Sequence, residues 1–276
     1  MALINFGTGT AGDGDTLYAA FVKINNIIGN GKGDISTNTA TGLNTLPANT
    51  TGSSNTGIGN NALSANTSGS NNTALGSVPL ALNTTGSNNT GLGFGALYNA
   101  GSLSNNTAVG YNSLSENTLY SNCSGLGAAT VVTASNQVQL GDSATTTYVY
   151  GTVQNRSDLR DKTEVRDTVL GLNFINELRP VDYKWDMRED YKTDSLDQIT
   201  NLTHDGTHTR SRFHHGLIAQ EVKEVIEASG VDFGGFQDHK VGGGDDVLSI
   251  GYDELIAPMI KAIQELTARI NVLEGN

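Results

Sequence analysis

The chain has 276 residues, a formal net charge of −12, 34 glycines, 4 prolines and a single tryptophan. This composition is closer to that of a repeat or fibrous protein than to that of an average globular enzyme. The acidity disfavours nucleic acid and anionic membrane surfaces as partners, because both bind clustered Lys and Arg. Cys123 is alone, which excludes an intrachain disulfide.

The first residues, MALINFGTGT, contain no basic segment followed by an apolar one, and no apolar run approaches membrane-spanning length. We therefore expect no secretion signal and no membrane insertion. Residues 15–28 place Leu17, Phe21, Ile24 and Ile28 at helical spacing, which predicts a short amphipathic helix buried against copies of itself.

The same stretch resembles a GD-x-L-x-x-AF-x-KIN segment found near the start of many phage structural proteins. The resemblance implies that residues 1–37 form an attachment and trimerisation segment, with other virion proteins as partners at this end.

A repeat with a period of 17 residues runs from Asn38 to residue 137. Its copies begin NTATGLNTL, NTGIGNNAL, NTALGSVPL, NTGLGFGAL, NTAVGYNSL and CSGLGAATV. Three rows of residues fall in register: Gly42, Gly59, Gly76, Gly93, Gly110 and Gly127; Leu46, Leu63, Leu80, Leu97, Leu114 and Val131; and Ile58, Leu75, Leu92, Val109 and Leu126, with Thr41 as the exception in the first copy.

A unit with about two apolar anchors cannot bury a core alone, so we expect it to be stabilised by stacked copies and by neighbouring chains. We predict one coil of a β-solenoid or β-roll per repeat over residues 38–137. The alternative, low-complexity disorder, fits the Asn/Thr/Gly composition but not the registered apolar rows. The repeats also resemble the A-[IVL]-G head repeats of trimeric bacterial adhesins. Residues 138–156 follow with short β-branched and aromatic runs, which predict strands that close the shaft.

The composition changes near Asn155, and the next segment is Ser157-Asp158-Leu159-Arg160-Asp161-Lys162. A serine hydroxyl becomes a nucleophile when a base removes its proton, and a lysine amine can be that base when it is buried. A serine and a lysine five residues apart can meet if the chain turns between them.

Three later segments, LNFINELRPVDYKWD, HHGLIAQEVKEV and VLSIGYDELIAPMIKAIQELTARINVLE, follow in the order expected of one family. Together they resemble the S74-type intramolecular chaperone domain that ends many phage tailspikes and tail fibres. The resemblance covers residues 157–276 and implies a domain that drives trimerisation of the shaft and then cuts itself off between Arg156 and Ser157. Ser157 would be the nucleophile, Lys162 the general base, and Asp158 a supporting residue that orients the turn or holds the lysine.

The last segment predicts trimerisation independently of this resemblance. Its apolar residues follow steps of 4, 3, 4, 3, 4 and 3, which is a heptad pattern, and are Tyr252, Ile256, Met259, Ile263, Leu266, Ile270 and Leu273. A core helix of a monomeric domain, the alternative, would show a wider apolar face. Pro258 is expected in the first turn of this helix or at a kink.

Other motifs predict no cofactor and no metal site. His204, His208, His214 and His215 lie close in sequence, but their spacing matches no zinc pattern. GNGKG at residues 29–33 lacks the spacing of a phosphate-binding loop. Glycan hydrolysis needs paired carboxylates, whereas Glu116 is the one charged residue in residues 38–137.

We therefore predict a mainly β protein with an α+β C-terminal part: a trimeric β-solenoid shaft followed by a chaperone domain that ends in a coiled-coil helix. The predicted function is a homotrimeric phage tail fibre or other surface fibre, made in the host cytoplasm and located in the virion. Its C-terminal domain would act once, as a serine-type autoprotease without activity on other substrates. The alternatives are an uncleaved structural fibre, or an adhesin that binds a host-surface glycan or protein, with an inert chaperone domain.

Overall fold

The computed structural model describes residues 37–192 and 201–275. The helix predicted within residues 15–28 lies outside the described residues. The chain divides into two compact units, one ending at Thr147 and the other beginning at Tyr148.

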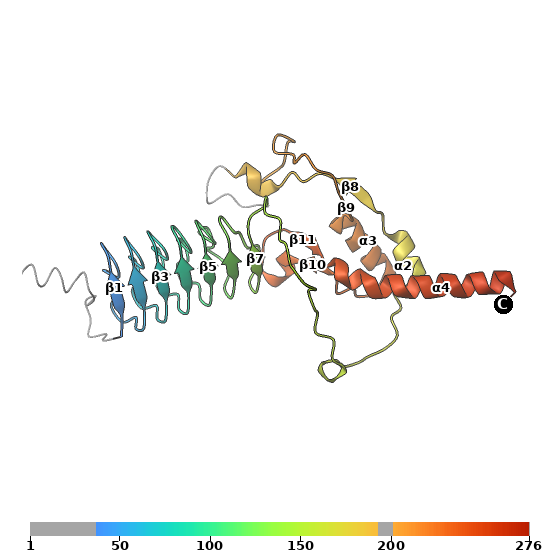
Figure 1. The fold of residues 1–276 in the computed structure, drawn as a ribbon, viewed down its shortest axis with the longest axis horizontal. Coiled ribbons are helices and arrows are strands. Elements are labelled where there is room, and N and C mark those ends of the chain that lie inside the picture. The colour runs from blue at the N-terminus through green and yellow to red at the C-terminus, as the bar shows by residue number, and fades with distance from the viewer. Residues whose placement is uncertain (1–36, 193–200, 276) are drawn as a thin grey trace, which may run out of the picture. The chain divides into compact units, whose positions relative to one another are not determined.

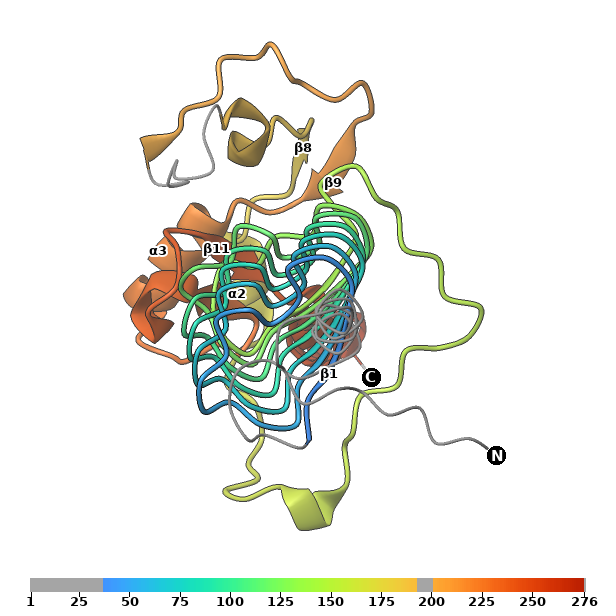
Figure 2. The same cartoon turned by 90° about the vertical axis from the view of Figure 1, so that its left-hand side faces the viewer.

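The first unit is a β-solenoid, as the repeat predicts. Seven short strands pair in parallel, in sequence order, to form one sheet (Figure 1). They are β1 (Thr39–Thr41), β2 (Thr56–Ile58), β3 (Thr73–Leu75), β4 (Thr90–Leu92), β5 (Thr107–Val109), β6 (Ser124–Leu126) and β7 (Val138–Leu140). From β1 to β6 each residue pairs with the residue 17 positions further on, for example Thr73 with Thr90. The coils therefore stack in register, as the view in Figure 2 shows.

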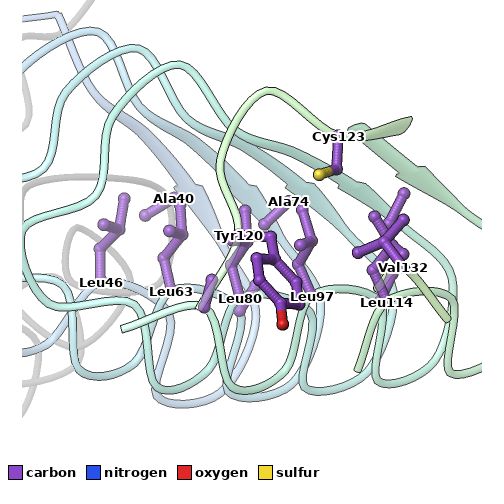
Figure 3. Close-up of a cluster of buried hydrophobic side chains, with 14 residues drawn as sticks. Ala40, Leu46, Leu63, Ala74, Leu80, Leu97, Leu114, Tyr120, Cys123 and Val132 are labelled. Carbon is purple, nitrogen blue, oxygen red and sulfur yellow. The ribbon is translucent and has the colours of Figure 1, made fainter. Parts of the chain in front are cut away.

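The leucine row forms the apolar core of the solenoid. Leu46, Leu63, Leu80, Leu97 and Leu114 are fully buried and stack one above another beside the alanines of the strands (Figure 3). In the sixth coil the core residue is Val132, whereas Val131, which the alignment placed in this row, is exposed. The last coil is shorter, since Ser124 pairs with Val138 only 14 residues on, and this shift changes which valine faces inward.

The row that contains Ile58 and Leu75 faces outward, although the sequence suggested it as a second apolar anchor of the coil. In each strand from β1 to β6 the middle residue is buried and its two neighbours point away from the core. Side chains alternate between the two faces of a strand, so the third residue cannot join the same core. We call Ile58, Leu75, Leu92, Val109, Leu126 and Leu140 the outer row.

A ladder of buried asparagines supplies the polar part of the core. The side-chain oxygen of Asn55 accepts a hydrogen bond from the backbone N–H of Asn72 at 2.9 Å, and Asn72 accepts likewise from Asn89. The Asn72 amide nitrogen donates to the carbonyl of Gly86 at 2.8 Å. Buried polar groups are costly unless they are hydrogen-bonded. Asparagine therefore recurs at these positions, because an apolar side chain would leave the buried backbone N–H and carbonyl groups without a partner.

The glycine row is explained by backbone geometry. Gly93 has φ +130°, and a Cβ atom there would lie 2.4 Å from the carbonyl oxygen of Gly110 in the next coil. Only glycine fits at this close approach between coils.

The second unit is a smaller α+β structure. Its elements are α2 (Leu172–Glu177), β8 (Val181–Tyr183), β9 (His214–Gly216), α3 (Ala219–Ser229), β10 (Phe236–Asp238), β11 (Leu248–Ile250) and α4 (Ile256–Glu274). Strands β8 and β9 pair antiparallel, and so do β10 and β11. The small core consists of Leu170, Phe174, Val222, Phe233 and Leu255.

One face of helix α4 packs against the rest of this unit. Pro258, in its first turn, and Ala262 are buried, and the Glu265 side chain accepts a hydrogen bond from the backbone N–H of Leu172 at 2.9 Å. Leu172 is the first residue of α2, so the Glu265 carboxylate satisfies one of the free N–H groups of that helix. None of the helices in residues 37–192 and 201–275 is long and apolar enough to cross a membrane.

The chain between the solenoid and the first helical turn of the second unit differs from the strands predicted for residues 138–156. One strand, β7, forms there, and residues 148–156 are exposed and belong to no helix or strand. Tyr148 and Tyr150 are among the most exposed apolar side chains of the described residues. The β-branched and aromatic composition of residues 148–156 favours a strand, but among the described residues this segment pairs with no strand.

Candidate functional site

A single 3-10 turn, Leu159–Asp161, brings Ser157 and Lys162 together. The ammonium nitrogen of Lys162 lies 2.7 Å from the hydroxyl oxygen of Ser157, to which it donates a hydrogen bond. The turn is closed at its end by a hydrogen bond from the backbone N–H of Lys162 to the carbonyl of Leu159 at 3.1 Å. The turn that the sequence required for these two side chains to meet is therefore present.

Asp158 caps this turn. Its carboxylate accepts a hydrogen bond from the backbone N–H of Arg160 at 2.9 Å, as an N-cap residue does. It also forms an ion pair with the Arg160 guanidinium at 2.6 Å. The hydrogen bond from the Arg160 side chain, followed by that from its backbone N–H, lowers the pKa of Asp158 below its ordinary value of 3.8. The contacts of Asp158 thus lie within the turn, with Arg160 as the partner of its carboxylate.

Arg156, on the other side of the predicted cleavage point, is also paired. Its Nε donates to the Asp161 carboxylate at 2.7 Å. Asn155 donates from its side-chain amide to Asp253 at 3.3 Å. Asp161 and Asp253 were not identified from the sequence: the opposite charges of Arg156 and Asp161 were a signal that could have been used, but nothing in the sequence relates Asn155 to a residue 98 positions away.

Both members of the Ser157–Lys162 pair are exposed. Residues 37–192 and 201–275 therefore do not supply the burial that we expected around a lysine base.

The four histidines do not gather into one site. His204 contacts Asp186 and His215 contacts Asp182, while His214 stacks on Tyr183 and His208 lies edge-on to Tyr191. Over residues 37–192 and 201–275, no group of three or more His, Cys, Asp or Glu side chains is arranged to hold a metal ion. His204 and His208 thus form separate pairs in the segment between β8 and β9, whereas His214 and His215, in β9, contact residues of β8.

The fold and the turn define a class of protein: a β-solenoid followed by an α+β module with a Ser–Lys pair at its start. Residues 157–231 match the Peptidase_S74 family, chaperone of endosialidase. The chain thus carries a chaperone-of-endosialidase domain, and the resemblance drawn from the sequence motifs is confirmed over these residues. No curated protein matches the chain.

Proposed function

We propose that this chain is the subunit of a homotrimeric phage fibre, and that its C-terminal domain drives folding of the trimer and is then released by one cut between Arg156 and Ser157. The observation that carries the proposal is the 2.7 Å contact between Lys162 Nζ and Ser157 Oγ, at the residue where the family match begins. The N-terminal segment would attach to other virion proteins, after synthesis in the host cytoplasm.

The chemistry starts with the Ser157 hydroxyl, which attacks the carbonyl carbon of Arg156 while its proton passes to the Lys162 amine. The carbon–nitrogen bond then breaks, and Lys162 returns the proton to the departing Ser157 amine, which leaves an ester between Arg156 and the Ser157 oxygen. Water hydrolyses the ester to a carboxylate on Arg156 and a free Ser157 hydroxyl. General-base assistance of this kind contributes roughly 10²- to 10⁴-fold to such a step.

Cleavage should follow assembly, because Ser157 and Lys162 are exposed in one chain. A lysine accepts a proton only as the neutral amine, and burial favours that form. Neighbouring chains that pack around residues 148–162 would supply the burial. The domain would then remain attached until the trimer has formed.

The C-terminal helix supports the trimer. The seven residues of the heptad pattern are all exposed on the single chain, while Pro258 and Ala262 on the other face are buried against the same chain. We call these seven residues the seam: Tyr252, Ile256, Met259, Ile263, Leu266, Ile270 and Leu273. An apolar row at heptad spacing is buried by copies of the same helix in a coiled coil, and residues 37–192 and 201–275 of the same chain leave it exposed.

The outer row of the solenoid supports the same conclusion. The in-register pairing places Ile58, Leu75 and Leu92 directly above one another, and the row continues to Leu140. Leu75 and Leu126 are 48% and 55% exposed. A partner that contacts the outer row in every coil must present apolar side chains at the same spacing. Another copy of this solenoid has that spacing. The near absence of charge in residues 38–137 also suits an apolar contact between identical faces.

The test is to express the wild-type chain beside Ser157→Ala and Lys162→Ala, and to compare them by denaturing gel and intact mass. We expect two fragments separated at Arg156–Ser157 from the wild type and a full-length chain from both variants. A wild type that stays full length in the assembled trimer overturns the cleavage. If all three chains are cut at this bond, the Ser–Lys assignment is wrong.

The second candidate is a fibre that binds a host-surface glycan or protein, with or without cleavage. One observation favours it: Phe94 and Tyr111, in adjacent coils, stack at 5.5 Å between ring centroids and are 50% and 60% exposed. An exposed aromatic pair among Asn, Ser and Thr side chains suits ligand contact. Binding of the wild type and of Phe94→Ala to a panel of host-surface glycans and envelope proteins tests it.

A further inference from the structure

The segment before the predicted cleavage point is held at two places. Residues 148–156 are exposed and outside the helices and strands, and their side-chain hydrogen bonds come from Asn155 and Arg156. These are the last two residues before the peptide bond between Arg156 and Ser157, on its acyl side. Both bonds end on carboxylates: Arg156 on Asp161, and Asn155 on Asp253.

The first carboxylate, that of Asp161, belongs to the turn that brings Ser157 and Lys162 together. Asp161 is the last residue of the 3-10 turn Leu159–Asp161, and Lys162 follows it directly. The backbone N–H of Asp161 donates to the carbonyl of Asp158 at 3.1 Å, so the turn fixes its position. One short turn therefore sets the distance between nucleophile and base and also restrains the residue whose carbonyl is attacked.

The second carboxylate belongs to the start of the C-terminal helix. Asp253 lies in the 3-10 turn Tyr252–Leu255, which runs into α4. This turn is well anchored, because Leu255 is buried in the core and the Tyr252 hydroxyl accepts a hydrogen bond from the backbone N–H of Leu217 at 3.0 Å. Tyr252 is also the first seam residue. Asp253 thus connects the acyl side of the bond to the helix that carries the seam.

We propose that Asp161 and Asp253 are positioning residues for the self-cleavage, which this inference takes from the proposed function. They hold Arg156 and Asn155 so that the Arg156 carbonyl stays within reach of the Ser157 hydroxyl. Neither carboxylate touches the reacting atoms. Attack requires the reacting atoms to be held at near-contact distance and aligned, and a flexible acyl segment would meet that condition for only a fraction of the time.

The expected effect of each contact is moderate. The Arg156 and Asp161 side chains are 80% and 41% exposed, and exposed pairs are weak. Loss of either carboxylate should slow cleavage about two- to fivefold, and loss of both should slow it by about the product of the two factors. By contrast, loss of Ser157 or Lys162 should stop it.

The experiment follows cleavage of the full chain over time after a pulse of cell-free synthesis, by denaturing gel. The variants are Asp161→Asn, Asp253→Asn and the double variant, with Asp167→Asn as the control, an exposed aspartate of the same module. Each substitution is also made in the Ser157→Ala background, where sedimentation and urea unfolding report assembly and stability without cleavage. We expect slower cleavage from the first three, a wild-type rate from Asp167→Asn, and unchanged trimers throughout.

A charge exchange separates positioning from a general structural role. Arg156→Asp alone and Asp161→Arg alone should both cleave slowly, and the double exchange should recover at least half of the lost rate. Wild-type rates in Asp161→Asn and Asp253→Asn, beside a wild type that cleaves, overturn this inference and leave the proposed function standing. The inference is also overturned if cleavage of the Asp161→Asn and Asp253→Asn variants slows only in proportion to a loss of trimer measured in the Ser157→Ala background. A wild-type trimer that never cleaves overturns both.

Discussion

Lys162 lies within hydrogen-bonding distance of Ser157, with 2.7 Å between Nζ and Oγ, because one turn capped by Asp158 closes the five-residue separation between them. The contact is local in sequence and depends on no distant element. Among residues 37–192 and 201–275, both side chains of the pair remain exposed.

Lys162→Arg should abolish cleavage. Arginine keeps the positive charge and can still donate to Ser157, but it cannot be deprotonated in a protein and so cannot serve as the base. We expect cleavage at least about 100-fold slower than in the wild type, the lower end of the usual general-base contribution. Intact mass measured over time checks this. The control is Lys223→Arg, which keeps its pairing with Asp238 and should cleave normally; a Lys162→Arg chain that cleaves at the wild-type rate removes the base assignment.

The turn should be insensitive to pH in the neutral range and weaken only in acid. The pKa of Asp158 is lowered in the folded chain, so its contribution is complete above the ordinary value of 3.8 and is lost as the pH falls through the lower folded pKa. Carboxyl carbon NMR of Asp158, in the Ser157→Ala variant, should give a midpoint below 3.8. Arg160→Gln should move that midpoint upward, because the guanidinium is the largest cause of the shift. An unchanged midpoint in Arg160→Gln would contradict the assignment.

Ile263→Asp should break the trimer. Ile263 is a seam residue, 62% exposed on the single chain, and a carboxylate there would be buried without a partner in the coiled coil. The cost should exceed about 3 kcal/mol per trimer. Analytical ultracentrifugation in the Ser157→Ala background should show monomer, and the same change in the cleavable chain should leave it full length. Gln264→Asp, one residue away and off the seam, is the matched control and should remain trimeric and cleave.

Gly93→Ala should destabilise the solenoid. The new Cβ would meet the Gly110 carbonyl at 2.4 Å and would require a φ of +130°, which alanine rarely adopts. Together these should cost about 3 kcal/mol or more. Urea unfolding followed by circular dichroism measures the loss. Gly151→Ala is the control, because nothing lies within 4 Å of its added Cβ; equal stability of the two variants would mean that the coils can separate at Gly93 without cost.

The sequence by itself determined the period of the solenoid, its glycine and leucine rows, and the chaperone-of-endosialidase domain. Repetition makes these features visible, because a position that recurs every 17 residues meets the same surroundings in each coil. The Ser157–Lys162 contact was also within reach of the sequence, since it depends on a single turn. Its catalytic role remains a prediction.

Only the tertiary structure decided which apolar row forms the core. Leu80 and Leu75 look alike in the aligned repeats, but Leu80 is fully buried and Leu75 is 48% exposed, since strand alternation sends the third residue of each strand outward. The same holds for the contact between Asn155 and Asp253, which lie 98 residues apart. A periodic pattern fixes what repeats along the chain, whereas the facing of a side chain and the meeting of distant residues depend on the packing of the whole unit.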